Sequence, residues 1–160
     1  MMLWRGSKAY FNAACILFKH EQGKTPFPRP DAPAYFLVCQ AIELVLKGFL
    51  RGSGKSEDSL VKEYGHNLMK ALDAAEKHGL TTLLKIETEE RSALKLVNAH
   101  YESKALQFTI EGVYDLPRFE VLLEIAEKLI AKTGAFCLKN RELHAGKPTA
   151  VIKLRSARKK

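Results

Sequence analysis

Residues 32–51, APAYFLVCQAIELVLKGFLR, form the most apolar stretch of this 160-residue chain and decide its fold. Before Arg51 its strongly polar side chains are Gln40, Glu43 and Lys47. They are spaced i, i+3 and i+7, so a helix would carry them as one narrow stripe on an otherwise apolar surface. Such a helix is typical of the centre of a helical bundle, and its two charged residues argue against a membrane span. The sequence therefore predicts a buried helix that ends near Arg51.

Helical patterns continue on both sides of this segment. The spacing of apolar residues predicts further helices over 7–19, 56–63, 67–77, 87–104 and 115–138. Asp31 and Asp115 each stand two residues before a proline, so each is predicted to be the N-cap of its helix. Only residues 150–154, AVIKL, have a strand-like pattern. The predicted fold is all-α: an antiparallel bundle of four to five helices (residues 1–138) and a basic C-terminal tail (139–160).

Positive charge is concentrated at the C-terminal end of the chain. The whole chain has a net charge of +8, but residues 128–160 contain ten Lys or Arg and one acid, a net charge of +9. One interpretation is a solvated tail that aids solubility. The other is a segment that docks on phosphate-rich partners by displacing their counterions. The candidate nucleic-acid-binding residues are Arg155, Arg158, Lys159 and Lys160.

The cysteines indicate a reducing compartment. Cys15, Cys39 and Cys137 are odd in number, far apart and without a Cys-x-x-Cys pair. The first two lie in apolar helical patterns, where a free thiol behaves as a small core residue. The apolar run near the N-terminus is too short and too interrupted by charge for a secretory signal. These features predict a cytoplasmic protein that does not associate with membranes.

No metal or cofactor is predicted. The five histidines have no partner at the i+4 spacing that a helical zinc site uses. The segment GSGKS (52–56) resembles part of a phosphate-binding loop, but that motif needs glycine where this chain has Phe49. It also needs a preceding strand, whereas a helix leads into this segment. A flexible connection between helices is the better interpretation.

The stretch EYGHNL (63–68) separates two helical patterns and allows two interpretations. Gly65 can adopt the positive φ that ends one helix, and Asn67 or His66 can cap the next. Alternatively, His66 lies beside the stripe of Glu43 and Lys47 and forms a polar cluster inside an apolar bundle. Buried polar groups need partners, so such a cluster is either a structural network or a cleft that holds a ligand.

Three successive segments together resemble one protein family: 41–52 (AIELVLKGFLRG), 64–80 (YGHNLMKALDAAEKHGL) and 94–108 (LKLVNAHYESKALQF). Over about residues 8–130 their order and spacing resemble a bacterial branch of HEPN proteins (higher eukaryotes and prokaryotes nucleotide-binding). In that branch a Glu-x3-Lys helix precedes a Gly-His-(Asp/Asn)-Leu helix and an LN-x-x-Y helix. The matching positions here are Glu43 and Lys47, then Gly65, His66, Asn67 and Leu68, then Val97, Asn98 and Tyr101.

The resemblance implies a bundle of four or five helices that forms a homodimer and acts on or near RNA and nucleotides. Many HEPN proteins are metal-independent endoribonucleases of toxin–antitoxin, antiphage and CRISPR-linked systems. Others accompany a minimal nucleotidyltransferase. The implied partners of this chain are therefore a second copy, RNA or a nucleotide, and an antitoxin or a nucleotidyltransferase-type protein.

The chain departs from the catalytic motif of that family, Arg-x(4–6)-His, in which His promotes attack by the ribose 2′-hydroxyl and Arg stabilises charge on phosphorus. No arginine here stands four to six residues before a histidine. The nearest approach is Lys139-Asn140-Arg141-Glu142-Leu143-His144, in which lysine replaces arginine and loses its planar two-point contact. Lys139, Asn140 and His144 are thus candidate catalytic residues in a segment predicted to follow the last helix.

The sequence leaves three hypotheses for the function of this chain. The favoured one is a non-catalytic HEPN-like module that binds RNA, a nucleotide or a partner protein through a cluster of Glu43, Lys47, His66 and Asn67. The second is a metal-independent endoribonuclease of toxin–antitoxin or antiphage type. The third is a structural dimerisation domain whose polar stripe faces solvent. The first requires Glu43, Lys47 and His66 to converge, whereas the third leaves them scattered.

Overall fold

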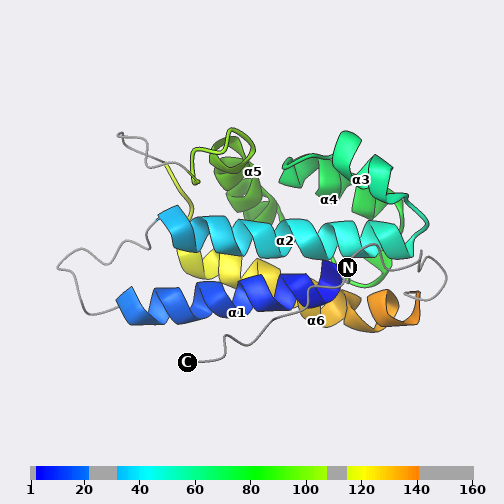
Figure 1. The fold of residues 1–160 in the computed structure, drawn as a ribbon, viewed down its shortest axis with the longest axis horizontal. Coiled ribbons are helices and arrows are strands. Elements are labelled where there is room, and N and C mark those ends of the chain that lie inside the picture. The colour runs from blue at the N-terminus through cyan, green and yellow to red at the C-terminus, as the bar shows by residue number, and fades with distance from the viewer. Residues whose placement is uncertain (1–2, 22–31, 108–114, 141–160) are drawn as a thin grey trace, which may run out of the picture.

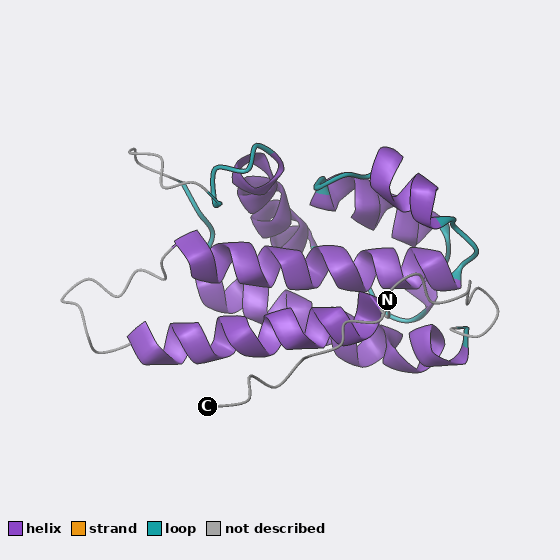
Figure 2. Cartoon of the chain, in the orientation of Figure 1, coloured by secondary structure: helices purple, strands orange, loops and turns teal. Residues whose placement is uncertain are grey.

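The structure is a computed structural model that describes residues 3–21, 32–107 and 115–140 (Figure 1). Within these ranges the chain forms α-helices and one short 3-10 helix, and no strand (Figure 2). The elements in chain order are α1 (Leu3–Glu21), α2 (Ala32–Gly52), α3 (Glu57–Lys62), α4 (Leu68–Lys77), η1 (Leu80–Thr82), α5 (Thr88–Glu102) and α6 (Phe119–Lys139). The predicted all-α fold is confirmed. The strand-like residues 150–154 lie outside the described part of the chain.

The helices surround α2 on several sides. In Figure 1, α1 and α6 lie along one side of α2, and α3, α4 and α5 lie along the other. α1 runs antiparallel to α2, whereas α6 runs in the same direction as α2 because α3–α5 intervene between them. The five α-helices with ten or more residues form the bundle, and the six-residue α3 is an addition at one end.

The central helix is buried along most of its length. From Ala41 to Leu50 every residue of α2 is buried, and Val38, Ile42, Val45 and Leu50 have no exposed surface. α2 is long and apolar enough to cross a membrane by length and composition, but 72% of that window is buried inside the structure. Contacts with the surrounding helices therefore account for its composition, as the sequence predicted.

Local side-chain contacts fix the ends of the middle helices. The Ser56 hydroxyl accepts a hydrogen bond from the Ser59 amide at 3.1 Å and caps α3. Asn67 caps α4 in the same way, with its Oδ1 2.8 Å from the Lys70 amide nitrogen. Before it, Gly65 has φ +50°, the left-handed conformation that glycine tolerates best. The helix-start interpretation of the EYGHNL stretch is confirmed, with Asn67 as the cap.

The start of α6 differs from the prediction. The helix begins at Phe119 with Arg118 as its N-cap, so Asp115 is not the cap and Pro117 is not in the first turn. Tyr35 of α2 donates a hydrogen bond to the carbonyl of Pro117 at 2.7 Å, and Phe119 packs edge-on against the Tyr35 ring. These tertiary contacts hold residues before Phe119 outside the helix. Asp31, the other predicted cap, lies outside the described residues.

The last helix also extends past the predicted boundary at residue 138. Lys139 is the final residue of α6, and Asn140 is its C-cap. The side-chain amide of Asn140 donates to the carbonyl of Phe136 at 2.9 Å, which satisfies one of the unpaired carbonyls at the helix end. Lys139 and Asn140 therefore belong to the end of α6.

The first helix begins at Leu3, four residues earlier than predicted. Trp4 packs against α6, where its indole nitrogen donates to the carbonyl of Ile130 at 3.0 Å. Two glycines make room: a Cβ at Gly134 would lie 2.9 Å from the Trp4 ring, and a Cβ at Gly48 would lie 3.3 Å from the Trp4 backbone nitrogen. Small residues on α2 and α6 thus allow the start of α1 to approach both helices.

Replacement of Trp4 with alanine should lower the free energy of unfolding by about 2–3 kcal/mol, because it removes a large packed ring and leaves a cavity. The loss falls below that of a fully buried tryptophan because Trp4 is only partly buried. Urea denaturation measures it. The neighbouring Arg5→Ala, at an exposed position, should change stability by less than about 0.5 kcal/mol. Equal effects of the two substitutions would contradict this account of the contact.

Candidate functional site

Side chains of α2 and of the turn before α4 meet in a compact polar network. Lys47 Nζ lies 2.6 Å from Glu43 Oε1, one helical turn away, and donates to the backbone carbonyl of Gly65 at 2.5 Å. His66 Nδ1 lies 3.0 Å from the other carboxylate oxygen, Oε2. The predicted convergence of Glu43, Lys47 and His66 is therefore confirmed. The Gly65 carbonyl is a member that the sequence did not indicate.

A fourth side chain comes from α5. The Tyr101 hydroxyl lies 2.7 Å from Glu43 Oε2 and 2.6 Å from the side-chain oxygen of Gln40. Burial, together with the negative charge of Glu43, raises the pKa of Tyr101 far above its ordinary value. Tyr101 is therefore a neutral donor. Its ring also stands edge-on to the His66 ring, with centroids 5.8 Å apart.

The network compensates two buried charges on an apolar helix. Glu43 is 4% exposed and Lys47 is 8% exposed. A charge removed from water is tolerated only when it is paired and hydrogen-bonded, and both carboxylate oxygens and the ammonium group have such partners. His66 is different, since 40% of its side chain remains exposed. The network is thus closed around Glu43 and open to solvent at the imidazole ring.

Asn67 belongs to a second network. Its side-chain nitrogen donates to Glu102 Oε2 at 2.8 Å, while its oxygen caps α4. Asn98 of α5 accepts the Leu68 amide at 2.7 Å and donates to the same Glu102 oxygen at 3.3 Å. This placement corrects the prediction that grouped Asn67 with Glu43, because the Asn67 side chain is already engaged in starting α4 and joining it to α5.

Of the remaining predicted site residues, the structure describes Lys139 and Asn140. Lys139 and Asn140 end α6, and the Asn140 amide group is bonded to the Phe136 carbonyl. The structure does not describe His144 or the four basic residues of the tail, Arg155, Arg158, Lys159 and Lys160.

The described residues offer neither a metal-ligand cluster nor an activated thiol. No three His, Cys, Asp or Glu side chains gather within metal-binding distance among them. Burial raises the pKa of the Cys39 thiol strongly and that of Cys137 to about 11, so both thiols are protonated at neutral pH. Burial also raises the pKa of Cys15. The three cysteines are packed or partly packed free thiols.

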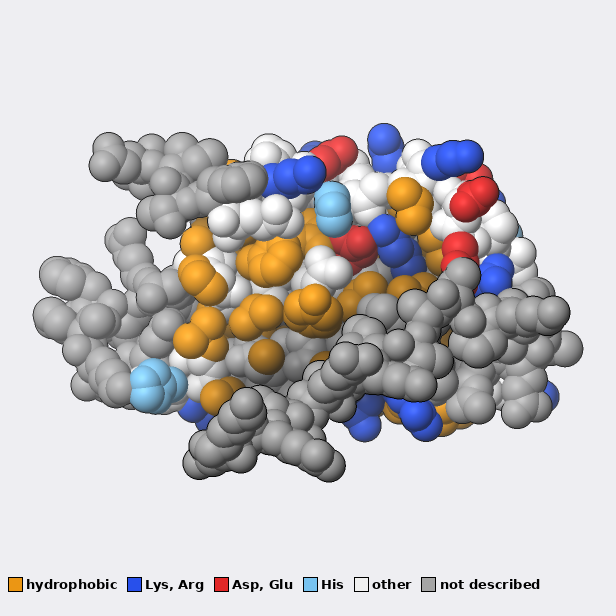
Figure 3. Space-filling model, viewed as in Figure 1, with side chains coloured by type: hydrophobic (Ala, Val, Ile, Leu, Met, Phe, Trp, Pro, Cys, Tyr) orange, Lys and Arg blue, Asp and Glu red, His pale blue; other side chains and the backbone are white. Residues whose placement is uncertain are grey.

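Apolar side chains gather on the outer side of α1 and α2, next to the Glu43 network. Figure 3 shows hydrophobic side chains over these two helices, with a histidine and charged side chains at the upper edge. We call this surface the apolar face and define it by Tyr10, Ala13 and Leu17 of α1 and Phe36 and Leu37 of α2, which are all partly exposed. The Phe36 ring lies 6.0 Å from the Tyr101 ring, so the face borders the network.

Comparison with models of known protein families, with curated proteins and with solved structures gives no match for this chain. The fold and site define the chain as an all-α helical bundle with a satisfied ionic network on its central helix.

Proposed function

We propose that this chain is a non-catalytic HEPN-like module that forms a homodimer and binds RNA in the cytoplasm. One observation carries the proposal. The three segments that resemble HEPN proteins each contribute a side chain to a single network: Glu43 and Lys47 from the first, His66 from the second and Tyr101 from the third. This shared network supports the resemblance, because the polar positions of the three segments interact with one another.

The first role of the Glu43 network is structural. Glu43 accepts bonds from three elements, so the network fixes the turn before α4 and the position of α5 against α2. The exposed edge of His66 then lies on a rigid surface, which favours recognition of a partner. A structural domain with a solvated polar stripe would leave Glu43 and Lys47 exposed, whereas both are buried.

The homodimer is supported by the apolar face. Its five defining residues carry no charge, while the opposite flank of α1 carries Arg5, Lys8 and Lys19. Two copies can meet through the apolar face without bringing like charges together, and contiguous exposed apolar surface is typical of protein–protein contacts. Contact between two copies through the basic flank would bring like charges together and would be unfavourable.

The absence of catalysis is supported by the chemistry of the C-terminal segment. Lysine keeps the charge of the arginine in the family's motif but not its two-point contact with phosphate oxygens. The Asn140 side chain is committed to the end of α6. A single-stranded RNA incubated with the chain should therefore remain intact, as seen on a denaturing gel, and expression of the chain should not slow growth.

The binding experiment uses a fluorescein-labelled single-stranded oligouridylate and fluorescence anisotropy. We expect binding that weakens as salt rises, because the tail's cations displace counterions from the RNA. Replacement of Arg155, Arg158, Lys159 and Lys160 with glutamine should flatten this dependence. With four phosphate contacts, the wild-type affinity should fall about 50-fold more than that of the variant between about 50 and 200 mM salt.

A matched variant removes the same charge elsewhere. Lys62, Lys85, Lys95 and Lys132 are exposed side chains on the bundle, and their replacement with glutamine should keep most of the salt dependence. If both variants lose it equally, RNA is attracted by net charge alone. If the wild-type chain does not bind the RNA at low salt, or cleaves it, the proposed function is wrong.

A further inference from the structure

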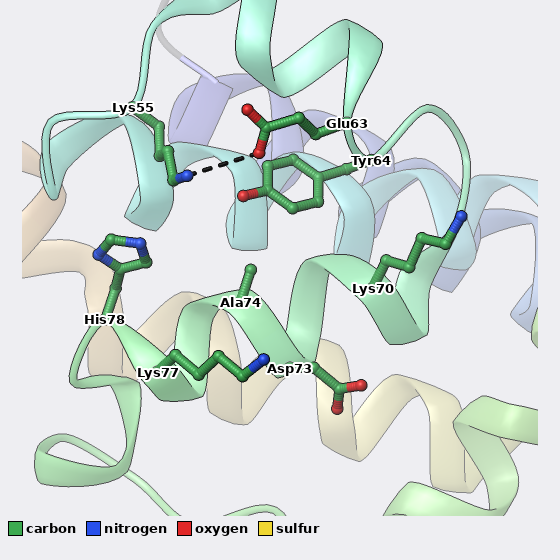
Figure 4. Close-up of a pocket in the computed structure, with 8 residues that line it drawn as sticks. All are labelled: Lys55, Glu63, Tyr64, Lys70, Asp73, Ala74, Lys77 and His78. Carbon is green, nitrogen blue, oxygen red and sulfur yellow. Dashed lines mark hydrogen bonds and ion pairs between the residues drawn. The ribbon is translucent and has the colours of Figure 1, made fainter.

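A solvent-filled hollow lies between α3 and α4, with a volume of about 440 Å³. It is separate from the Glu43 network, although Tyr64, which forms part of its wall, directly precedes Gly65. Figure 4 shows its lining side chains, which are Lys55, Glu63, Tyr64, Lys70, Asp73, Ala74, Lys77 and His78. Volumes of this order hold small molecules of metabolite size.

Three lysines, Lys55, Lys70 and Lys77, are among the residues that line this hollow. Lys55 Nζ is 3.4 Å from Glu63 Oε2, a loose ion pair. The ammonium groups of Lys70 and Lys77 have no hydrogen-bond or ion-pair partner within the described residues. The exposed ring of His78 stands at the same rim (Figure 4). The hollow thus presents two cations with free hydrogen-bonding capacity.

The two carboxylates of the hollow are already compensated. Asp73 Oδ1 accepts a bond from Arg91 of α5 at 2.7 Å. Glu63 accepts a hydrogen bond from the Ser59 hydroxyl as well as the Lys55 contact. Both carboxylates are therefore paired with groups of the protein. The charge that remains unpaired in the hollow is positive.

Lys70 has a placement that helix stability does not explain. It is the third residue of α4, where the positive end of the helix dipole repels a cation. Lys77 ends the same helix, where a cation is favourable, so its position alone says little. An anion beside Lys70 would offset this repulsion, since the first turn of α4 contains no acidic side chain that does so.

We infer that the hollow between α3 and α4 binds the phosphate group of a small phosphate monoester, with Lys70 and Lys77 as its main ligands and Lys55 as a third. Ammonium groups suit a phosphate because they donate charge-assisted hydrogen bonds from several directions. The Tyr64 ring, largely buried between the two helices, supplies a wall for the organic part. The same chemistry occurs in a free metabolite and at the 5′-phosphate end of an RNA.

The test is a titration of the full-length ¹⁵N-labelled chain followed by amide chemical shifts. Ribose 5-phosphate represents the free monoester, and a short oligouridylate with a 5′-phosphate is compared with the same oligonucleotide ending in a 5′-hydroxyl. Saturable shifts are expected around Tyr64, Lys70, Ala74 and Lys77. Ribose without phosphate should cause none. Preference for the phosphorylated RNA end over ribose 5-phosphate would identify the RNA as the source.

Lys70→Gln with Lys77→Gln should weaken binding of ribose 5-phosphate at least about tenfold, because two charge-assisted hydrogen bonds are lost. The matched control, Lys62→Gln with Lys95→Gln, removes two exposed lysines that do not line the hollow. Equal loss in both variants, shifts spread over the whole surface, or no saturable binding would overturn the inference. The result does not depend on the RNA-binding proposal, whose test replaces only the tail residues.

Discussion

Replacing Glu43 with alanine is expected to lower the free energy of unfolding by about 3–5 kcal/mol. The substitution leaves the buried ammonium group of Lys47 without its carboxylate and removes one of the two acceptors of the Tyr101 hydroxyl. Loss of one partner from a buried pair is far more damaging than loss of an exposed pair, because the remaining charge stays out of water. The turn at His66 would also lose its contact with α2.

Urea denaturation monitored by circular dichroism measures this effect. Glu124→Ala is the matched control, since Glu124 is exposed on α6 and the same atoms are removed; it should change stability by less than about 0.5 kcal/mol. Replacing the pair together, Glu43→Leu with Lys47→Met, should destabilise less than Glu43→Ala alone, because no uncompensated charge remains. A small effect of Glu43→Ala would mean that the network does not hold α4 and α5 against α2.

The convergence of Glu43, Lys47 and His66 could be predicted because it depends on simple geometry. A narrow polar stripe on a helix that is otherwise apolar has to meet partners when the helix is buried. The EYGHNL turn was the nearest segment able to supply them. No comparable rule selects Tyr101, since a tyrosine on the buried face of α5 is also an ordinary core residue. Its contact with Glu43 depends on how α5 crosses α2.

Helix starts that depend on long-range contacts were the weakest part of the prediction. Asp115 and Pro117 have the local pattern of a helix start, yet a hydrogen bond from Tyr35 to the Pro117 carbonyl delays α6 to Phe119. In the same way, Asn98 binds the amide at the start of α4 from thirty residues away. Caps made within one segment, such as Asn67, are visible in the sequence; contacts between segments are not.

The hollow between α3 and α4 could not be predicted for the same reason. Lys55 lies in the connection before α3, whereas Lys70 and Lys77 lie seven residues apart on α4. Each resembles an ordinary surface lysine in the sequence. One signal was present: Lys70 stands three residues after the Asn67 cap, where an acidic residue would be favourable. A cation in the first turn of a helix is a reason to look for an anionic ligand.

Ala13→Arg is expected to convert the proposed dimer into a monomer, with dimer affinity at least about 100-fold weaker. Ala13 lies in the middle of the α1 residues of the apolar face, between Tyr10 and Leu17. In a symmetric contact, each copy would place the new guanidinium group against an apolar surface, where a charge without a partner is strongly unfavourable. Sedimentation velocity over a range of protein concentrations measures the change.

Asn12→Arg is the matched control because it adds the same side chain one residue away. Asn12 shares the basic flank of α1 with Lys8 and Lys19, at spacings of four and seven residues, so it lies outside the proposed contact. The Asn12 variant should remain dimeric. Tyr10→Arg, at another partly exposed residue of the apolar face, keeps the experiment valid if Ala13→Arg disturbs folding.

Three outcomes separate the alternatives for the apolar face. A wild-type dimer that only Asn12→Arg disrupts would place the contact on the basic flank and overturn the assignment. A wild-type chain that is monomeric at every concentration would show that another partner, or a further segment of this chain, covers the face. A dimer lost in Ala13→Arg and Tyr10→Arg but kept in Asn12→Arg would bring two copies of the His66 edge toward one shared surface, because Phe36 of the face lies against Tyr101.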